Sequence, residues 1–128
     1  TVIWTIEERN LPDVRGNAVA LQEVLTNLVS NAIRYNRPGG KVVIDAEARG
    51  KEVVVHVRDT GIGMTKEEMQ DLFQEFYRVK NKETRNTEGT GLGLFVSKQL
   101  IEKIGGSMWV ESAKGKGSVF SFSLARVK

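Results

Sequence analysis

The chain has 128 residues, which is one ordinary domain by length, and at that size roughly two thirds of the unfolded chain's surface can be buried. With 40% hydrophobic and 27% charged residues, no cysteine and no apolar run near the ~18 residues of a membrane span, the composition excludes a disordered tail, disulfides and a spanning helix. A net charge of +3 without a polybasic block favours a solvated mixed-charge surface over nucleic-acid binding.

The first half of the chain predicts a strand, a helix and a hairpin. Apolar and polar residues alternate over residues 1–8, which is typical of a strand. Asn17 is a candidate N-cap, and apolar residues then recur at three- and four-residue spacing over residues 18–35, as in an amphipathic helix. Two alternating runs at residues 41–48 and 52–59 predict an antiparallel hairpin.

The second half predicts two more helices and a second hairpin. Residues 65–76 begin with a Thr-x-x-Glu capping box and predict a short helix. Residues 78–91 form a long polar loop, and loops of that length are usually functional. Residues 94–106 predict a helix that ends at a Gly-Gly pair, before a hairpin at residues 107–112 and 118–125. Two hairpins plus helices predict an α+β two-layer sandwich with a mixed, mostly antiparallel sheet.

Three polar residues share one face of the first predicted helix. Asn27, Asn31 and Arg34 fall at i, i+4 and i+7, and two stacked asparagines cost helix propensity. A solvated polar face is one interpretation. A carboxamide oxygen is also a suitable Mg²⁺ ligand and a basic group suits phosphate, so a nucleotide site is the other.

A second candidate site follows the strand at residues 52–59, in the pattern D-x-G-x-G. The plain interpretation is a tight turn with Asp59 as its cap, where Gly61 and Gly63 allow close backbone approach. A buried carboxylate needs hydrogen-bond donors, and the amino group of adenine is a suitable one. Guanine presents a carbonyl at the same place, so this site would prefer adenine.

Glycines also precede the last predicted helix, which begins near Leu92. Bare amides at Gly89, Gly91 and Gly93 with a helix start predict an anion site. The spacing fits neither the dinucleotide fingerprint nor the phosphate loop that ends in Gly-Lys-Ser/Thr. The sole histidine, His56, lies in the middle of a predicted strand, so we expect it to be a packed or surface strand residue. One histidine without any cysteine does not favour a zinc site.

The order of these signals resembles the four boxes of sensor histidine kinase catalytic domains, within the ATPase group shared with gyrase, mismatch-repair and heat-shock chaperone ATPases. The matching segments cover nearly the whole chain: "LQEVLTNLVSNAIRYN", "DTGIGM", "LFQEFYRV" and "GTGLGLFVSKQLIEKIGGSMWVESAKGKGSVFSFSL". A box with Phe73 and Phe76 points to histidine kinases within that group. The resemblance implies a Bergerat-type ATP-binding fold, with a sheet packed on about three helices and a flexible ATP lid.

The resemblance also assigns roles to positions of this chain. Asn31 would ligate the Mg²⁺ that bridges the phosphates, with Asn27 alongside; Arg34 would reach phosphate, and Tyr35 would form a wall of the base pocket. Asp59 would hold the adenine amino group, with the adjacent turn at Gly61 and Gly63. Arg78 would lie near the γ-phosphate. The lid would be closed over the phosphates by Gly89, Thr90, Gly91, Leu92, Gly93 and Leu94.

The implied activity is that of a two-component kinase, which binds ATP–Mg²⁺ and donates the γ-phosphate to a histidine for onward transfer to an aspartate of a response regulator. In hydrolysing relatives a glutamate stands at the place of Asn27, and an amide cannot act as a base, which fits slow hydrolysis. Family acceptor histidines lie in a preceding helical segment, unlike His56. We therefore expect residues 1–128 to be a cytoplasmic catalytic domain, from a longer chain that can be membrane-anchored, and to bind ATP without autophosphorylating.

The expected partners are ATP, the dimerisation and acceptor-histidine domain of its own homodimeric parent chain, and the receiver domain of a response regulator. No nucleic acid or direct membrane contact is expected. Three alternatives remain: an anti-sigma-factor-like serine kinase, opposed by the phenylalanine box and the C-terminal hairpin; a non-catalytic ATP-sensing interaction module; and a basic nucleic-acid binder, supported only by mild charge.

Overall fold

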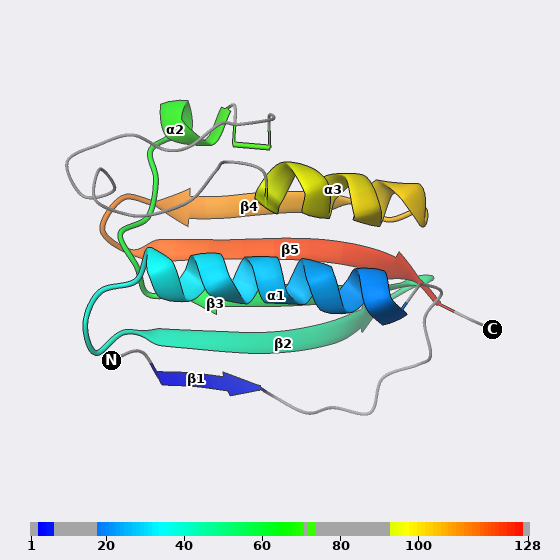
Figure 1. The fold of residues 1–128 in the computed structure, drawn as a ribbon, viewed down its shortest axis with the longest axis horizontal. Helices are drawn as coiled ribbons and strands as arrows, with labels where there is room; N and C mark the ends of the chain where they lie inside the picture. Colours follow the sequence, from blue (N-terminus) through cyan, green and yellow to red (C-terminus); the bar gives the residue numbers. More distant parts are fainter. Residues whose placement is uncertain (1–2, 7–17, 71, 74–92, 127–128) are drawn as a thin grey trace.

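A computed structural model describes residues 3–6, 18–70, 72–73 and 93–126 of the chain. The described residues form three helices and five strands (Figure 1). Their order and bounds are β1 (Ile3–Ile6), α1 (Ala18–Arg34), β2 (Lys41–Arg49), β3 (Glu52–Asp59), α2 (Lys66–Gln70), α3 (Gly93–Lys103), β4 (Met108–Ala113) and β5 (Gly117–Ala125). The predicted strand, the long first helix and both hairpins are confirmed within these residues; the N-cap prediction for Asn17 lies outside them.

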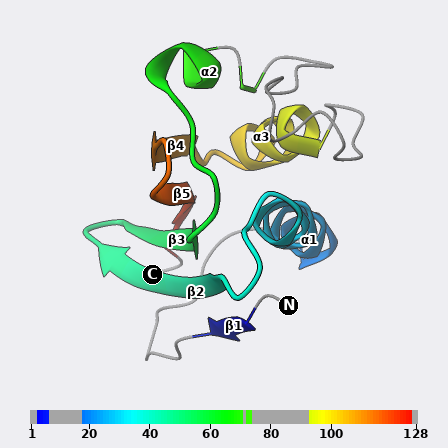
Figure 2. The same cartoon turned by 90° about the vertical axis from the view of Figure 1, so that its left-hand side faces the viewer.

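The strands form one mixed sheet in the order β1-β2-β3-β5-β4. Only β1 runs parallel to its neighbour β2, and the other three pairings are antiparallel, as the sequence predicts. Helices α1 and α3 pack side by side on one face of the sheet, and α2 lies beyond its β4 edge (Figure 2). The architecture is the expected two-layer α+β sandwich.

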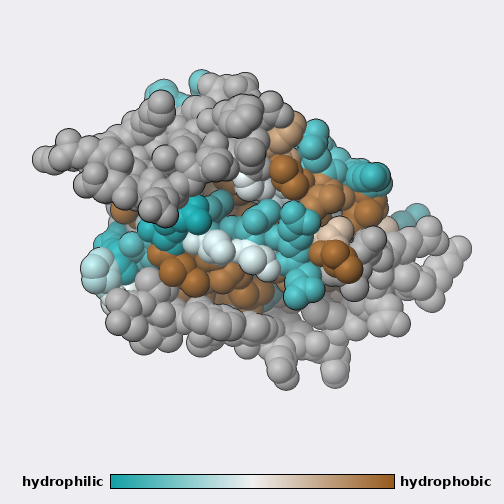
Figure 3. All heavy atoms as spheres, in the orientation of Figure 1, coloured by the Kyte–Doolittle hydropathy of each residue, from teal (hydrophilic) through white to brown (hydrophobic). Residues whose placement is uncertain are grey.

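The core lies between α1, α3 and the covered face of the sheet. The predicted apolar positions of α1 all belong to it, with Val24 and Leu28 fully buried, because their spacing keeps them on one side of the helix. Sheet residues such as Phe122 and Val57 meet them, and each such burial stabilises the fold by about 1.5–3 kcal/mol. The outward side of α1 carries a band of hydrophilic residues (Figure 3).

Helix α2 is shorter than the sequence predicts. The predicted capping box is confirmed, because the Thr65 N–H donates to Glu68 Oε1 at 2.9 Å and the Glu68 N–H donates to Thr65 Oγ1 at 3.2 Å. The helix nevertheless ends at Gln70. The Leu72 N–H then donates to the carbonyl of Met69, a tight turn that places Leu72 in the core. This turn follows the helix before the predicted boundary, whose last residues, 74–76, lie outside the described residues.

The end of α3 is a complete glycine cap. The Gly106 N–H donates to the carbonyl of Ile101 at 2.9 Å, and the Gly105 N–H donates to that of Glu102 at 3.1 Å. Gly105 has φ +87°, a left-handed conformation that favours glycine. A Cβ on Gly106 would overlap the carbonyl oxygen of Ser123 on β5, so the second glycine serves close packing of the helix end on the sheet.

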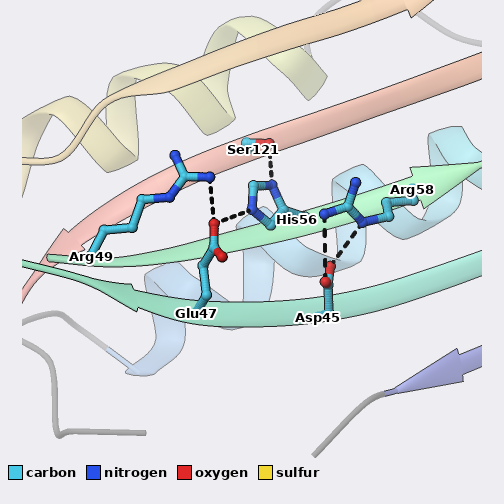
Figure 4. A network of polar contacts seen from close by, with 6 residues as sticks. All are labelled: Asp45, Glu47, Arg49, His56, Arg58 and Ser121. Atoms are coloured by element: carbon cyan, nitrogen blue, oxygen red, sulfur yellow. Dashed lines mark hydrogen bonds and ion pairs between the residues drawn. The ribbon is translucent and has the colours of Figure 1, made fainter. Parts of the chain in front are cut away.

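None of the described helices covers the other face of the sheet, and His56 lies there in a polar network (Figure 4). Its Nδ1 lies 2.6 Å from Ser121 Oγ on β5, and its Nε2 lies 3.3 Å from Glu47 Oε1 on β2. The hydrogen bond with His56 and the neighbouring Arg49 guanidinium hold the pKa of Glu47 below its usual range. His56 is only 6% exposed, so it is a packed strand residue, as predicted.

Candidate functional site

The polar face of α1 borders the first residue of α3. Asn27 and Asn31 are half-buried, whereas Arg34 is exposed in the last turn of the helix. A Cβ on Gly93 would lie 3.8 Å from Cγ of Asn27, an ordinary contact distance. The structure therefore brings Asn27 beside the N-terminus of α3, where unpaired N–H groups and the helix dipole favour an anion.

Ser97 fixes the side chain of Asn27. Its hydroxyl accepts a 3.1 Å hydrogen bond from Nδ2 of Asn27, and Ser97 itself is fully buried on the side of α3 that faces α1. The two residues are 70 positions apart in the chain, and no sequence pattern points to their pairing. Ser97 is thus a site residue that sequence reasoning missed.

Asp59 lies at the end of β3 with its carboxylate partly satisfied by backbone. Oδ1 accepts hydrogen bonds from the N–H of Gly61 at 2.9 Å and of Ser118 at 3.2 Å. Within the described part of the chain, Oδ2 accepts none. Burial raises the pKa of Asp59, while the two backbone hydrogen bonds act in the opposite direction. One carboxylate oxygen is therefore held in place and the other is left to accept a donor.

The glycines next to Asp59 are required by close backbone approach. A Cβ on Gly61 would lie 2.5 Å from the carbonyl oxygen of Tyr35 and 2.9 Å from Oδ1 of Asp59. Gly63 has φ +67°, and a Cβ there would overlap the Ala113 carbonyl at the end of β4. These contacts bring the main chain of Tyr35 and the D-x-G-x-G turn together, and they confirm the predicted close backbone approach at Gly61 and Gly63.

Gly117 and Ser118 at the start of β5 complete the surroundings of Asp59, and sequence reasoning missed both. Gly117 has φ +103°, and a Cβ on it would overlap the carbonyl oxygen of Asp59. The close approach that this glycine allows brings the Ser118 N–H to the carboxylate. The glycines of "AKGKG" were the available signal, but nothing in the sequence pairs that turn with Asp59.

Several predicted site residues lie outside the described residues: Arg78, Gly89, Thr90, Gly91 and Leu92. The same holds for the predicted lid over residues 78–91 and for Phe76. Of the predicted lid positions, Gly93 begins α3 and Leu94 packs against the core. The anion-binding loop therefore stays a prediction, while the helix that follows it is confirmed.

The phenylalanine box contributes Phe73 to a groove between α2 and α3. Its ring meets Phe120 edge-on at 6.4 Å between centroids, and Nζ of Lys98 lies 4.9 Å from the centre of the same ring. The groove has a volume of about 390 Å³, and Phe95 and Gln99 are among its lining residues. These contacts connect α3 to the segment that follows α2.

The described residues could bind Mg²⁺ only together with a ligand that supplies further oxygen atoms. They contain no group of three or more histidine, cysteine, aspartate or glutamate side chains that could hold a metal by themselves. Mg²⁺ is commonly bound by one or two protein oxygens together with phosphate oxygens and water. The half-buried carboxamide of Asn31 suits that arrangement. None of the helices in the described part is long and apolar enough to cross a membrane.

Comparisons with known proteins identify the family and the fold of this chain. The sensor protein SrrB of Staphylococcus aureus is 42% identical over 106 residues, which are 83% of this chain and 18% of SrrB, so the chain spans under a fifth of that relative's length. The catalytic domain of histidine kinase ThkA superposes with a TM-score of 0.80 at 31% identity, covering 98% of this chain and 79% of that one.

Full-length ShkA, solved in complex with AMPPNP, superposes with a TM-score of 0.79 at 28% identity, over 98% of this chain and 26% of that one. Residues 16–128 also match the model of one family, described as the histidine kinase-, DNA gyrase B- and HSP90-like ATPases. The fold of this chain thus has counterparts in solved histidine kinases. The chain belongs to this ATPase family, as a catalytic domain of the sensor histidine kinase type.

Proposed function

We propose that this domain binds ATP–Mg²⁺ and donates its γ-phosphoryl group to a histidine on the dimerisation domain of its own parent chain, for onward transfer to a response regulator aspartate. The observation that carries the proposal is the Asp59 carboxylate, with Oδ1 held by two backbone amides and Oδ2 without a hydrogen-bond donor among the described residues. An adenine amino group would supply that donor. The nucleotide-analogue complex of the similar kinase ShkA supports the same class of ligand.

The phosphates would lie at the opposite end of the site, between α1 and the start of α3. Asn31 would hold a Mg²⁺ ion shared with the nucleotide, with Asn27 alongside, and Arg34 and Arg78 would supply positive charge. The amides of residues 89–94 would surround the phosphate oxygens. Magnesium would neutralise the charge that develops on these oxygens during transfer.

In the transfer step, a ring nitrogen of the acceptor histidine forms a bond to the γ-phosphorus. The bond from that phosphorus to its bridging oxygen breaks, ADP leaves with the electron pair, and the second ring nitrogen releases its proton to solvent. The carboxamide of Asn27 cannot remove a proton from water, so hydrolysis should be slow. Catalysis would then rest on positioning and charge stabilisation.

His56 does not suit the acceptor role. It is 6% exposed, and both ring nitrogens lie within hydrogen-bond distance of neighbours on the sheet face away from α1 and α3. The acceptor would therefore belong to another part of the parent chain, which agrees with SrrB being much longer than the matched region.

Two measurements test the proposal. Calorimetric titration should detect ATP binding that depends on Mg²⁺ and is much stronger than GTP binding. Incubation with labelled ATP should leave no acid-labile phosphate on this chain alone, but should give phosphohistidine when the parent chain's acceptor domain is added. Phosphoserine on a separate partner would instead favour the serine-kinase alternative, and ATP binding without any transfer would favour a sensing module.

A further inference from the structure

Arg37, in the connection between α1 and β2, joins two turns that are distant in sequence. Its Nη2 donates to the carbonyl oxygen of Gly61 at 2.9 Å and to that of Gly115 at 2.8 Å. Gly61 belongs to the turn after β3, and Gly115 belongs to the turn between β4 and β5. These segments meet at one end of the sheet (Figure 1), where a single guanidinium nitrogen bridges them.

One of the bridged turns, and the strand that follows the other, hold the Asp59 carboxylate. The N–H of Gly61 donates to Oδ1 from the first turn, and the N–H of Ser118 on β5, three residues after Gly115, donates to the same oxygen. The β3–β5 register already fixes Ser118 beside Asp59, so the Arg37 bridge acts on the Gly61 turn, whose carbonyl it holds and whose N–H donates to Oδ1.

Arg37 is not needed to attach the D-x-G-x-G turn to the end of α1. The carbonyl of Tyr35 already accepts the N–H of Ile62 at 3.2 Å, and Thr60 Oγ1 donates to Oδ1 of Asn36 at 3.3 Å. The distinct contribution of Arg37 is its bridge to the β4–β5 turn. One backbone hydrogen bond already joins the two turns, from the Gly115 N–H to the carbonyl of Ile62 at 2.7 Å. The guanidinium of Arg37 adds charge-assisted hydrogen bonds to this contact.

We propose that Arg37 is a positioning residue for adenine recognition, which acts by holding the Gly61 turn, whose N–H donates to the Asp59 carboxylate, against the Gly115 turn. The inference rests on the proposed ATP-binding function. It assigns to Arg37 a role in base preference without contact to the base, and no sequence motif used above includes this residue.

The test compares Arg37→Met, Arg37→Lys and the control Arg126→Met by calorimetric titration with ATP, GTP and inorganic tripolyphosphate in Mg²⁺. Arg126 is a matched control, because it too is an exposed arginine that donates to a turn carbonyl, that of Gly50, at 3.0 Å. Arg37→Met should weaken ATP binding about tenfold, the effect of one charge-assisted hydrogen bond, and should leave tripolyphosphate binding unchanged. The preference for ATP over GTP should narrow.

Arg37→Lys keeps the positive charge but has a shorter side chain that cannot bridge both carbonyls. Its ATP affinity should therefore fall nearly as much as that of Arg37→Met. If lysine retains full affinity, charge and not bridging is responsible, and the proposal is overturned. Equal losses for ATP and tripolyphosphate, or no loss beyond that of Arg126→Met, would overturn it as well. Failure of the unmodified chain to bind ATP would instead refute the proposed function, so the two failures are distinguishable.

Discussion

Nδ2 of Asn27 on α1 donates a hydrogen bond to the buried hydroxyl of Ser97 on α3, at 3.1 Å. This contact connects the polar face of the first helix to the helix that follows the predicted phosphate-binding glycines. It leaves Oδ1 of Asn27 with no hydrogen bond in the described part of the structure. The orientation of one proposed phosphate-site residue thus depends on a hydroxyl to which the sequence analysis assigned no role.

The first prediction concerns this pair. Ser97→Ala should weaken ATP–Mg²⁺ binding about fivefold, the effect of losing one neutral hydrogen bond, because the Asn27 carboxamide is no longer held. In an Asn27→Ala background the same substitution should have no further effect, and titration of all four variants measures the coupling. Ser121→Ala removes another buried serine hydroxyl, on the far face of the sheet, and should leave ATP affinity unchanged. Equal losses in both backgrounds would contradict the positioning role.

Asp59→Asn should lower the affinity for ATP without lowering the stability of the fold. The amide oxygen of asparagine can still accept the N–H groups of Gly61 and Ser118, so the fold is retained. Its NH₂ group would face the adenine amino group, donor against donor, and ATP affinity should fall by roughly 10–100-fold. Thermal unfolding without nucleotide should occur at the same or a higher temperature. A large loss of stability with unchanged ATP affinity would refute the role in base recognition.

Burial raises the pKa of Asp59, and this predicts opposite pH trends for stability and for binding. Because the folded chain binds this proton more tightly than the unfolded chain, the stabilisation is fully present below the usual carboxyl pKa of about 4 and is lost as pH rises through the raised value. Binding requires the ionised form, so ATP affinity should rise over the same window. Urea unfolding and ATP titrations between about pH 4 and 7 measure both trends, and Asp59→Asn should remove this component of each.

Asn31→Ala should reduce the dependence of ATP binding on magnesium. If the carboxamide oxygen ligates Mg²⁺, its removal weakens binding in Mg²⁺ and leaves binding in EDTA nearly unchanged. The ratio of the two dissociation constants is the informative quantity. Gln22→Ala changes an exposed amide on the same helix and should preserve the ratio. An unaltered ratio for Asn31→Ala would exclude the metal role.

Gly63→Ala should destabilise the fold far more than Gly39→Ala. Both glycines have left-handed φ, +67° and +76°, so each substitution carries about 1–2 kcal/mol of backbone strain. A Cβ on Gly39 meets nothing within 4 Å, whereas one on Gly63 overlaps the Ala113 carbonyl. Urea unfolding gives the loss of stability that each substitution causes. The extra loss in Gly63→Ala therefore measures the close approach of the D-x-G-x-G turn to β4. Equal values would show that this approach is not tight in solution.

Local patterns in the sequence determined much of this domain. The spacing of Val24 and Leu28 predicted the buried side of α1, alternation predicted both hairpins, and the Thr65–Glu68 capping box predicted the start of α2. The four motifs predicted the ATPase family. These features succeed because helix capping, side-chain periodicity and turn formation depend on residues a few positions apart.

Only the tertiary structure decided which residues support the site. Ser97 meets Asn27 across 70 positions, Ser118 meets Asp59 across 59, and Arg37 meets Gly115 across 78. Such pairings depend on sheet order and helix packing, which place distant segments within hydrogen-bond distance and leave no periodic signal in the sequence. The early end of α2 is also a feature of the tertiary structure, in which a turn follows the helix and Leu72 joins the core.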